Sequence, residues 1–429
     1  MRFRSRLRSS SALWAAPFSL AIPVLYYLTG ASRPAPPVLD DAAVVISAPL
    51  YYSYALAYAV TSALAAWESG RLKEWGVRDR APARSRFRVA AEVLWPVTLL
   101  GWLVVLVPVV MALVDHGVRP TETGLRPVWL ALLLCAAHAV IGFAVGRLLP
   151  KVVAAPVMAI VVWVAVSFPV SFETAWPRHV SGAFLTDLMF GEAATYRALL
   201  PHLLLTGSIA AALALCWVRI PHAVLRTGLA VCLAAAGTTS AYAMTHSWGY
   251  DPPLLADQAP EVCSGSAPRV CVPRALGGGL RPADQAVRRA LKDFDEAGVR
   301  LAPRLVEDDV TQGRAAGSRP STPDTWRPSL TAGVRAGHPR YVVAMEAVTP
   351  PCARPDRRHL MAAQLWAARV TGTDRELRVD LDRRRQGDPE EAAVQDRAEA
   401  EFRAARRLPA ASQSEWYRHE LRLACGAGR

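Results

Sequence analysis

The first part of this chain of 429 residues alternates between long apolar runs and shorter polar stretches. The apolar runs cover residues 12–28, 43–66, 89–114, 128–149, 152–170, 198–218 and 228–244. Most are close to the roughly 20 residues that a helix needs to cross the hydrocarbon layer of a membrane. The first and last runs are the shortest. The pattern therefore predicts a polytopic α-helical membrane domain with six to seven spans over residues 1–245.

The rest of the chain is rich in Arg, Asp and Glu and has no long apolar run. Proline and glycine are frequent in residues 246–284, which favours an irregular linker. The spacing of apolar positions predicts helices at 283–297, 358–370, 390–408 and 414–424, and the alternation in residues 341–348 predicts a strand. We therefore expect a small α+β domain over residues 285–429.

Positive charge is concentrated in alternate loops. The N-terminal segment carries Arg2, Arg4, Arg6 and Arg8, and the loop 67–88 is strongly basic. Basic loops of membrane proteins remain in the cytoplasm, which predicts a multi-pass protein of the plasma membrane with a cytoplasmic N-terminus. With seven spans, the C-terminal domain is extracytoplasmic. Residues 1–31 also fit a signal peptide, but no convincing cleavage site follows them and removal would break the alternation, so a retained helix is favoured.

The seven cysteines fall into two groups. Cys135, Cys216 and Cys232 lie within apolar runs, where they act as small apolar side chains. Cys263, Cys271, Cys352 and Cys425 lie in the polar half, and an even number in an extracytoplasmic domain predicts two disulfides. Three pairings are possible. The simplest joins Cys263 to Cys271 in a small loop and Cys352 to Cys425. Reduced cytosolic thiols are the alternative, and the irregular spacing without a Cys-x-x-Cys pair disfavours zinc.

Net charge and motifs narrow the range of functions. The net charge of +13 is explained by loops beside apolar runs, and no basic helix, zinc finger or RNA-binding motif indicates a nucleic-acid partner. The stretch Gly277–Gly279 has no following Lys, as a phosphate-binding loop requires. The pair His419-Glu420 is followed by Leu423 where a metalloprotease helix needs its second His. We therefore expect no enzymatic site and no cofactor in this chain.

His138 is an ionisable residue inside the fourth apolar run. Placing an ionisable group within the hydrocarbon layer costs free energy, so such residues often mark a transport pathway. A neutral histidine can also serve a structural role by forming a hydrogen bond with a neighbouring helix. The structural role is the favoured interpretation.

The layout resembles the membrane subunit of ABC-2 type transporters, particularly permease-like proteins of actinobacteria with an extra C-terminal extracytoplasmic domain. The basic segment 1–11 leads into the first span as that family's interfacial helix does. The loop 68–88, which reads ESGRLKEWGVRDRAPARSRFR, resembles the segment that docks on a separate ATPase, and residues 172–196 match the position of its external hairpin helices. The scarcity of Lys and the abundance of Ala, Arg, Val and Pro also fit a high-GC genome such as that of an actinobacterium.

The resemblance implies an exporter subunit that works in a lipid bilayer as a homo- or heterodimer with a separate ABC ATPase. The implied docking residues are Arg71, Trp75, Val77, Arg78 and Arg80. A basic loop that only sets the membrane orientation explains the same charges. The alternative function is a non-transporting, membrane-anchored surface protein whose extracytoplasmic domain senses or binds a ligand or partner.

Overall fold

The computed structural model divides the chain into two compact units, Met1–Gln258, here called the helical unit, and Ala259–Arg429, here called the C-terminal unit. It describes residues 9–32, 41–76, 85–218, 222–315, 319–331, 338–350, 352, 354–385 and 389–426. Each unit has a hydrophobic core of its own.

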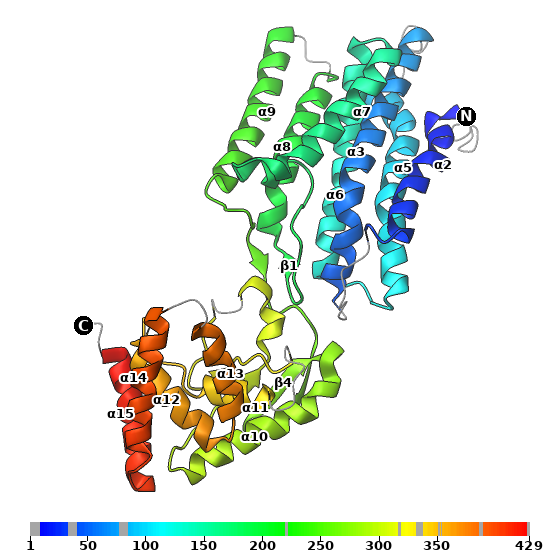
Figure 1. Ribbon diagram of the computed structural model, residues 1–429. Coiled ribbons are helices and arrows are strands. Elements are labelled where there is room, and N and C mark those ends of the chain that lie inside the picture. The colour runs from blue at the N-terminus through cyan, green and yellow to red at the C-terminus, as the bar shows by residue number, and fades with distance from the viewer. Residues whose placement is uncertain are drawn as a thin grey trace. The chain divides into compact units, whose positions relative to one another are not determined.

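The helical unit is built from long apolar helices (Figure 1). They are α2 (Ser11–Leu28), α3 (Ala42–Glu74), α5 (Arg86–Asp115), α6 (Glu122–Leu148), α7 (Lys151–Ser167), α8 (Tyr196–Leu215) and α9 (Ala223–Thr245). Within the described ranges, seven helices are long and apolar enough to cross a membrane. The number of candidate spans thus equals the upper number that the sequence predicts, and the unit has a polytopic helical fold.

Polar side chains define where several of these helices begin. Ser10, Thr121 and Thr195 each accept a hydrogen bond from a backbone N–H of the helix that follows. Such caps satisfy N–H groups that have no partner inside the helix. Asp41 caps α3 through Oδ1, 2.9 Å from the nitrogen of Ala43, while its Oδ2 accepts from the N–H of Gly191 at 2.7 Å. One buried carboxylate therefore joins the start of α3 to the segment before α8.

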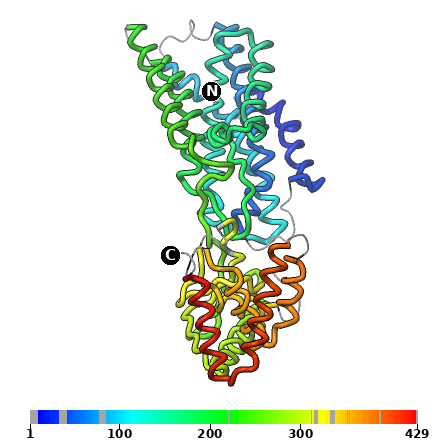
Figure 2. The backbone as a smooth tube through the Cα atoms, turned by 60° about the vertical axis from the view of Figure 1, so that its left-hand side comes forward, coloured from blue at the N-terminus to red at the C-terminus, as the bar shows by residue number. Residues whose placement is uncertain are grey.

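Helix α3 lies at the centre of the helical unit and packs against α2, α5, α6 and α7. Helix α8 packs between α6 and α9, and α9 lies at the edge with most of its surface exposed (Figures 1 and 2). Between α7 and α8 the chain forms the 3₁₀ turns η1 (Phe168–Ser171) and η2 (Trp176–His179). The short strand β1 (Ala193–Ala194) then pairs with β2 (Leu254–Leu255), beyond the end of α9.

The C-terminal unit combines a small mixed sheet with a group of helices. Strands β3 (Glu261–Ser264), β4 (Arg269–Pro273), β5 (Leu305–Glu307) and β6 (Thr325–Trp326) lie in that order, antiparallel for the first pair and parallel for the next two. Between these strands lie η3 (Arg274–Gly279), α10 (Leu280–Glu296) and η4 (Asp309–Ala315). The helices that follow are α11 (His338–Glu346), α12 (Arg357–Val370), α13 (Asp374–Arg385), α14 (Pro389–Ala405) and α15 (Ala410–Gly426).

The core of this unit fills the space between the sheet and its helices. Val270 and Val306 from the strands pack with Val287 of α10 and Val343 of α11. A second cluster places Trp366 of α12 against Tyr417 of α15, with ring centroids 4.4 Å apart. The two-layer arrangement with segregated helices agrees with the predicted α+β class.

Two predictions for this half differ from the structure. Residues 341–348, predicted as a strand, belong largely to helix α11, whose buried Val343 and Ala344 are adjacent rather than alternate. A short apolar stretch does not distinguish strand from helix by periodicity alone, which explains the error. The predicted linker 246–284 contains β3 and β4, and both are integral to the sheet.

Candidate functional site

The last turns of α3 are held by an ionic network that also reaches α2. Glu68 is 7% exposed, and its Oε1 accepts a hydrogen bond from the backbone N–H of Ser11 at 2.6 Å. Arg71 donates through Nη1 to the same carboxylate at 3.0 Å and to the carbonyl oxygen of Ser9 at 2.9 Å. The start of α2 is thus fixed to α3 from both sides, by an accepted and a donated hydrogen bond.

The same end of α3 is attached to α6 and α7. Lys151, the first residue of α7, forms an ion pair with Glu74 in the last turn of α3, with Nζ and Oε2 2.5 Å apart. Lys73 donates to the backbone carbonyl of Arg147 near the end of α6, at 3.4 Å. We call Glu68, Arg71, Lys73, Glu74 and Lys151 the α3-end network. A displacement of this end of α3 would be transmitted to three other helices.

Two of the residues that the resemblance assigns to ATPase docking, Arg71 and Trp75, are described by the structure. The guanidinium of Arg71 bonds to Glu68 and Ser9 within the protein, and it also lies 4.6 Å from the ring centroid of Trp75. Trp75 is 54% exposed, so its indole is accessible to a partner. Val77, Arg78 and Arg80 lie outside the described residues.

Close backbone packing makes α3 and α6 a rigid pair. A Cβ added at Gly142 would lie 2.1 Å from the carbonyl oxygen of Ser62, and one at Gly146 would lie 2.1 Å from that of Ala66. Small residues let helix backbones approach in this way, and membrane helices use them for tight association. The backbones of α3 and α6 are therefore in direct contact over at least one helical turn.

A group of buried polar residues lies in the interior of the helical unit. Tyr58 of α3 donates to the carbonyl oxygen of Gly182 at 3.0 Å, and the N–H of Gly182 donates to Nδ1 of His202 at 3.1 Å. The imidazole of His138 stacks on Tyr58 with centroids 4.8 Å apart, and neither of its nitrogens has a hydrogen-bond partner among the described residues. We call these four residues the interior polar layer. It links α3, α6 and α8 to the segment that follows η2.

The hydrogen bonds of this layer define the tautomer of His202. Because Nδ1 of His202 accepts from a backbone N–H, a neutral His202 carries its proton on Nε2. His138 belongs to the layer through stacking rather than hydrogen bonding.

A cavity of about 220 Å³ opens next to this region. Its walls include Tyr26 of α2, Tyr52 and Tyr54 of α3, and Trp163 of α7. The hydroxyls of Tyr54 and Ser32, which also lines the cavity, are buried without a hydrogen-bond partner among the described residues. Aromatic walls with a few hydroxyls suit an amphipathic molecule.

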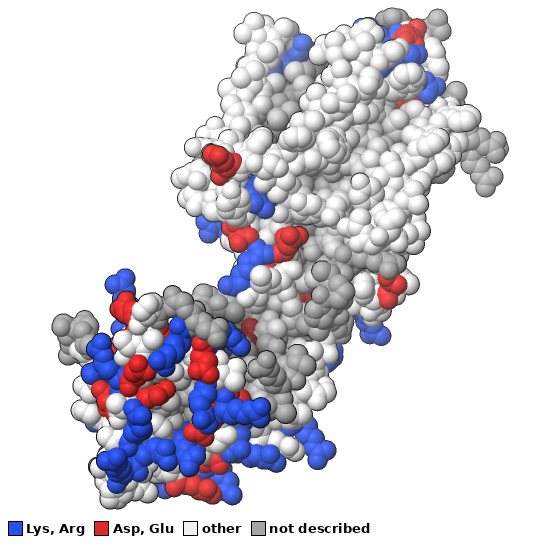
Figure 3. Space-filling view, in the orientation of Figure 1, with Lys and Arg blue, Asp and Glu red and all other residues white. Residues whose placement is uncertain are grey.

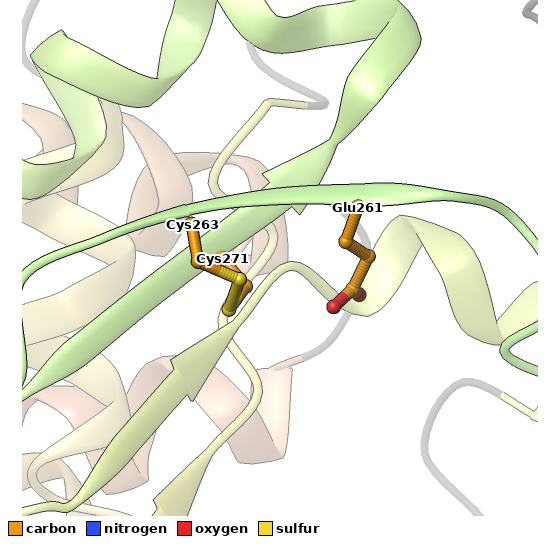
Figure 4. Close-up of side chains that lie close together, drawn as sticks. All are labelled: Glu261, Cys263 and Cys271. Atoms are coloured by element: carbon orange, nitrogen blue, oxygen red, sulfur yellow. A yellow bond between two sulfur atoms is a disulfide. The ribbon is translucent and has the colours of Figure 1, made fainter.

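Two disulfides join the four cysteines of the C-terminal unit, Cys263 with Cys271 and Cys352 with Cys425. The first is a cross-strand link between β3 and β4, and the second ties the segment before α12 to the end of α15. Glu261 lies near the first pair (Figure 4), in a set of residue types that bind metals. Because each sulfur is bonded to the other, neither is the thiolate that a metal ion requires.

A second group of this kind consists of His359, Glu401 and Glu420. Nδ1 of His359 lies 2.6 Å from Glu420, and the guanidinium of Arg358 lies 2.8 Å from Nε2. Arg358 also pairs with Glu401 at 3.1 Å. Since arginine only donates, Nε2 accepts and Nδ1 carries the proton. Two hydrogen bonds and the Arg358–Glu401 ion pair therefore join α12, α14 and α15 in this group.

Comparison of the chain with protein-family models, with curated proteins and with solved structures finds no match. The interpretation of function therefore depends on the arrangement of the residues themselves.

Several residues of these sites were missed by sequence reasoning. Glu68 and Lys151 appear in the sequence as polar residues at span ends, and nothing shows that they bond to other helices. His202 lies in an apolar run, and the argument that singles out His138 applies to it equally. Gly182 carries no signal at all, because its role depends on backbone groups placed by the tertiary fold.

Proposed function

We propose that this protein is the permease-like membrane subunit of an ABC-2 type exporter and that it works as a dimer with a separately encoded ATPase. The observation that carries the proposal is the α3-end network. A transporter driven from outside the membrane needs a point at which force on a loop reaches several spans at once. The loop that follows Trp75 continues from the helix end where α2, α6 and α7 are attached.

Three further features support the proposal. The tight pairing of α3 with α6 provides a stiff element between the loop and the interior polar layer. The two 3₁₀ turns between α7 and α8 lie in the chain where the family has its external hairpin helices. The aromatic-lined cavity offers space for an amphipathic cargo.

The proposal includes an orientation. Basic residues flank the helix ends that carry the α3-end network, and the positive-inside rule assigns those ends to the cytoplasm. After seven crossings the C-terminal unit is then extracytoplasmic, in the oxidising environment where disulfides persist. Few charged residues are visible on the helices in Figure 3, whereas cations and anions are intermixed on the C-terminal unit, as expected for a surface in water.

Purification of the tagged protein from its native membrane in mild detergent tests the proposal. We expect a Walker-type ATPase in stoichiometric amount by mass spectrometry, and its loss in Trp75→Ala. Trp129→Ala is the matched control, because Trp129 is 62% exposed near the opposite end of the helices. Recovery of the protein alone in repeated mild detergents contradicts the exporter function. Equal loss of the ATPase in both variants contradicts docking at Trp75.

A second candidate function is a surface protein that senses or binds a ligand through its C-terminal unit. The observation that favours it is the independent core of this unit, closed by two disulfides. A membrane-impermeant thiol label distinguishes the topologies. Labelling of the four C-terminal cysteines after reduction in intact cells agrees with both functions. Labelling only in broken cells contradicts the surface-protein function and the orientation with seven crossings.

A further inference from the structure

The aromatic-lined cavity of about 220 Å³ has buried polar groups and an apolar rim. Ser32 and Tyr54 line it and are only 2% and 1% exposed, and neither hydroxyl has a hydrogen-bond partner among the described residues. Four large side chains of the same wall are 43–48% exposed, namely Ile22, Tyr26, Tyr52 and Trp163. The unbonded hydroxyls therefore lie inside, and the side chains around the opening present apolar and aromatic surface.

This cavity lies where two spans end. Its wall includes Tyr26 in the last turn of α2 and Ser167, the last residue of α7. In the orientation proposed above, both of these helix ends are at the extracytoplasmic face of the membrane. The exposed apolar rim then borders the acyl chains of the outer leaflet. An amphipathic molecule can enter from that leaflet with its head group first and leave its chain in the lipid.

The charge of the wall restricts the head group. None of the described residues that line the cavity is charged. The last turns of α2 and α7 add the partial negative charge of helix C-termini. A phosphate or carboxylate would lose its water there without gaining a counter-ion, which costs free energy. The wall therefore favours an uncharged or cationic head group over an anionic one.

The two unbonded hydroxyls distinguish between the remaining head groups. Aromatic walls attract a quaternary ammonium, but this cation cannot form a hydrogen bond with Ser32 or Tyr54 and would leave both unbonded. A head group with one or two hydroxyls can bond to both.

The size of the cavity and the state of its other hydroxyls indicate a small head group. The hydroxyl of Ser53, also buried in the wall, already donates to the carbonyl oxygen of Pro49 at 2.7 Å. A sugar would therefore bring more hydroxyls than the interior of the cavity can bond. The volume is also below the range of about 300–1,000 Å³ that is usual for sites of drug-sized ligands.

We propose that this cavity binds an uncharged lipid with a small hydroxylated head group, of the monoacylglycerol or diacylglycerol class. The hydroxyls of the head group bond to Ser32 and Tyr54, the first carbons of the chain lie along Trp163, and the rest of the chain remains in the outer leaflet. The inference deepens the proposed function by naming a class of amphipathic cargo, and it rests on that function only in this respect. Binding itself requires neither the ATPase nor transport.

The test uses the full-length protein, delipidated in dodecyl maltoside and titrated by native mass spectrometry with 1-oleoylglycerol. We expect one tightly bound molecule, and about 30-fold weaker binding in the double variant Ser32→Ala, Tyr54→Phe, because two hydrogen bonds are lost. The matched control is Ser240→Ala, Tyr242→Phe, which removes two hydroxyls from exposed residues of α9, outside the cavity wall. It should leave the affinity within about twofold. An equal loss of affinity in the two double variants would overturn the proposal.

Three further ligands test the head group. Oleoyl lysophosphatidic acid adds a phosphate to the same molecule, and oleoylcholine replaces the glycerol with a quaternary ammonium. Both should bind about tenfold more weakly than 1-oleoylglycerol or worse. Glycerol, which has no chain, should not compete at equal concentration. Equal or tighter binding of either charged ligand, or equal competition by glycerol, would contradict the proposed class of lipid.

Tyr54→Phe keeps the aromatic ring and removes one oxygen, so it remains informative if the double variant fails to fold. We expect about fivefold weaker binding of 1-oleoylglycerol. Thermal stability without lipid should be unchanged or higher, because the lost hydroxyl has no partner among the described residues. Unchanged lipid affinity in Tyr54→Phe would contradict the proposed site. Copurification of an ATPase with a protein that does not bind the lipid would refute this inference alone, and lipid binding without an ATPase would refute only the exporter function.

Discussion

The backbone N–H of Ser11 donates to Oε1 of Glu68 at 2.6 Å and thereby joins the first turn of α2 to a residue 57 positions later, near the end of α3. The bond is charge-assisted and largely buried, the kind that contributes more than an ordinary hydrogen bond. Its carboxylate is also the partner of Arg71. One side chain therefore supports two separate attachments.

Glu68→Ala tests the importance of this attachment. We expect the free energy of unfolding to fall by about 1–3 kcal/mol, because Arg71 and the N–H of Ser11 lose their acceptor together. Thermal unfolding in mild detergent measures the change. Glu173→Ala, at an exposed position, is the control and should behave as the wild type. Equal stability of Glu68→Ala and the wild type would mean that the network does not hold α2.

The pairing of α3 with α6 leads to a second prediction. In Gly146→Ala the new methyl group would meet the carbonyl oxygen of Ala66, so the helices must separate, at a cost of about 1–3 kcal/mol. Gly228→Ala in α9 is the matched control, because nothing lies within 4 Å of the added carbon. It should be neutral or slightly stabilising, since alanine favours helix more than glycine does. Melting temperatures in detergent test this prediction, and we expect that of Gly146→Ala to be lower than that of Gly228→Ala.

Hydrophobicity predicts the spans of this protein well but predicts their polar ends poorly. The apolar run of α3 stops before Trp67, yet the helix continues to Glu74, where Glu68 bonds to the first residue of α2 and Glu74 pairs with Lys151 of α7. Such partners lie far away in the sequence, so no local pattern of residues predicts them. For the same reason the sequence does not predict the ion pair of Lys151, which resembles an ordinary basic residue at the start of a span.

The C-terminal unit shows the opposite limitation. The cysteines were identified from the sequence, and the structure adopts the simplest of the three pairings. The strands beside Cys263 and Cys271 were not identified, because they are short and flanked by prolines that favour a linker. Of these two strands, β4 pairs with β5, which lies on the far side of α10 in the chain, and β3 pairs with β4.

Asp308 makes the C-terminal unit sensitive to pH. Its side chain is fully buried and accepts from the backbone N–H groups of Leu330 at 3.2 Å and Thr331 at 3.1 Å. Burial raises the pKa of Asp308 to about 6, and that of a carboxyl in the unfolded chain is about 3.9. Between these values the folded state holds a proton that the unfolded state releases. The contribution of Asp308 is therefore largest below about pH 4 and is lost as the pH rises through about 6.

This linkage amounts to about 3 kcal/mol over the interval, at about 1.4 kcal/mol for each pKa unit. We expect the difference in stability between the wild type and Asp308→Asn to change by that amount between pH 4 and pH 7. Pulse proteolysis of the full-length protein in urea, with detection of C-terminal fragments, measures it. Exposed Asp324 supplies the control Asp324→Asn. A constant difference for Asp308→Asn across this range would show that Asp308 does not titrate there.

Two substitutions of His138 distinguish a structural role from a transport role for this residue of the interior polar layer. His138→Phe keeps an aromatic ring against Tyr58 and removes two nitrogens that lack partners among the described residues, so we expect stability to be unchanged or higher by about 1–2 kcal/mol. His138→Ala leaves a cavity and should lose about 2–4 kcal/mol. Melting temperatures of both variants in detergent test this. If His138→Phe is as unstable as His138→Ala, the ring nitrogens are bonded in the native protein. A stable His138→Phe that no longer exports its substrate would instead assign the imidazole to the transport pathway.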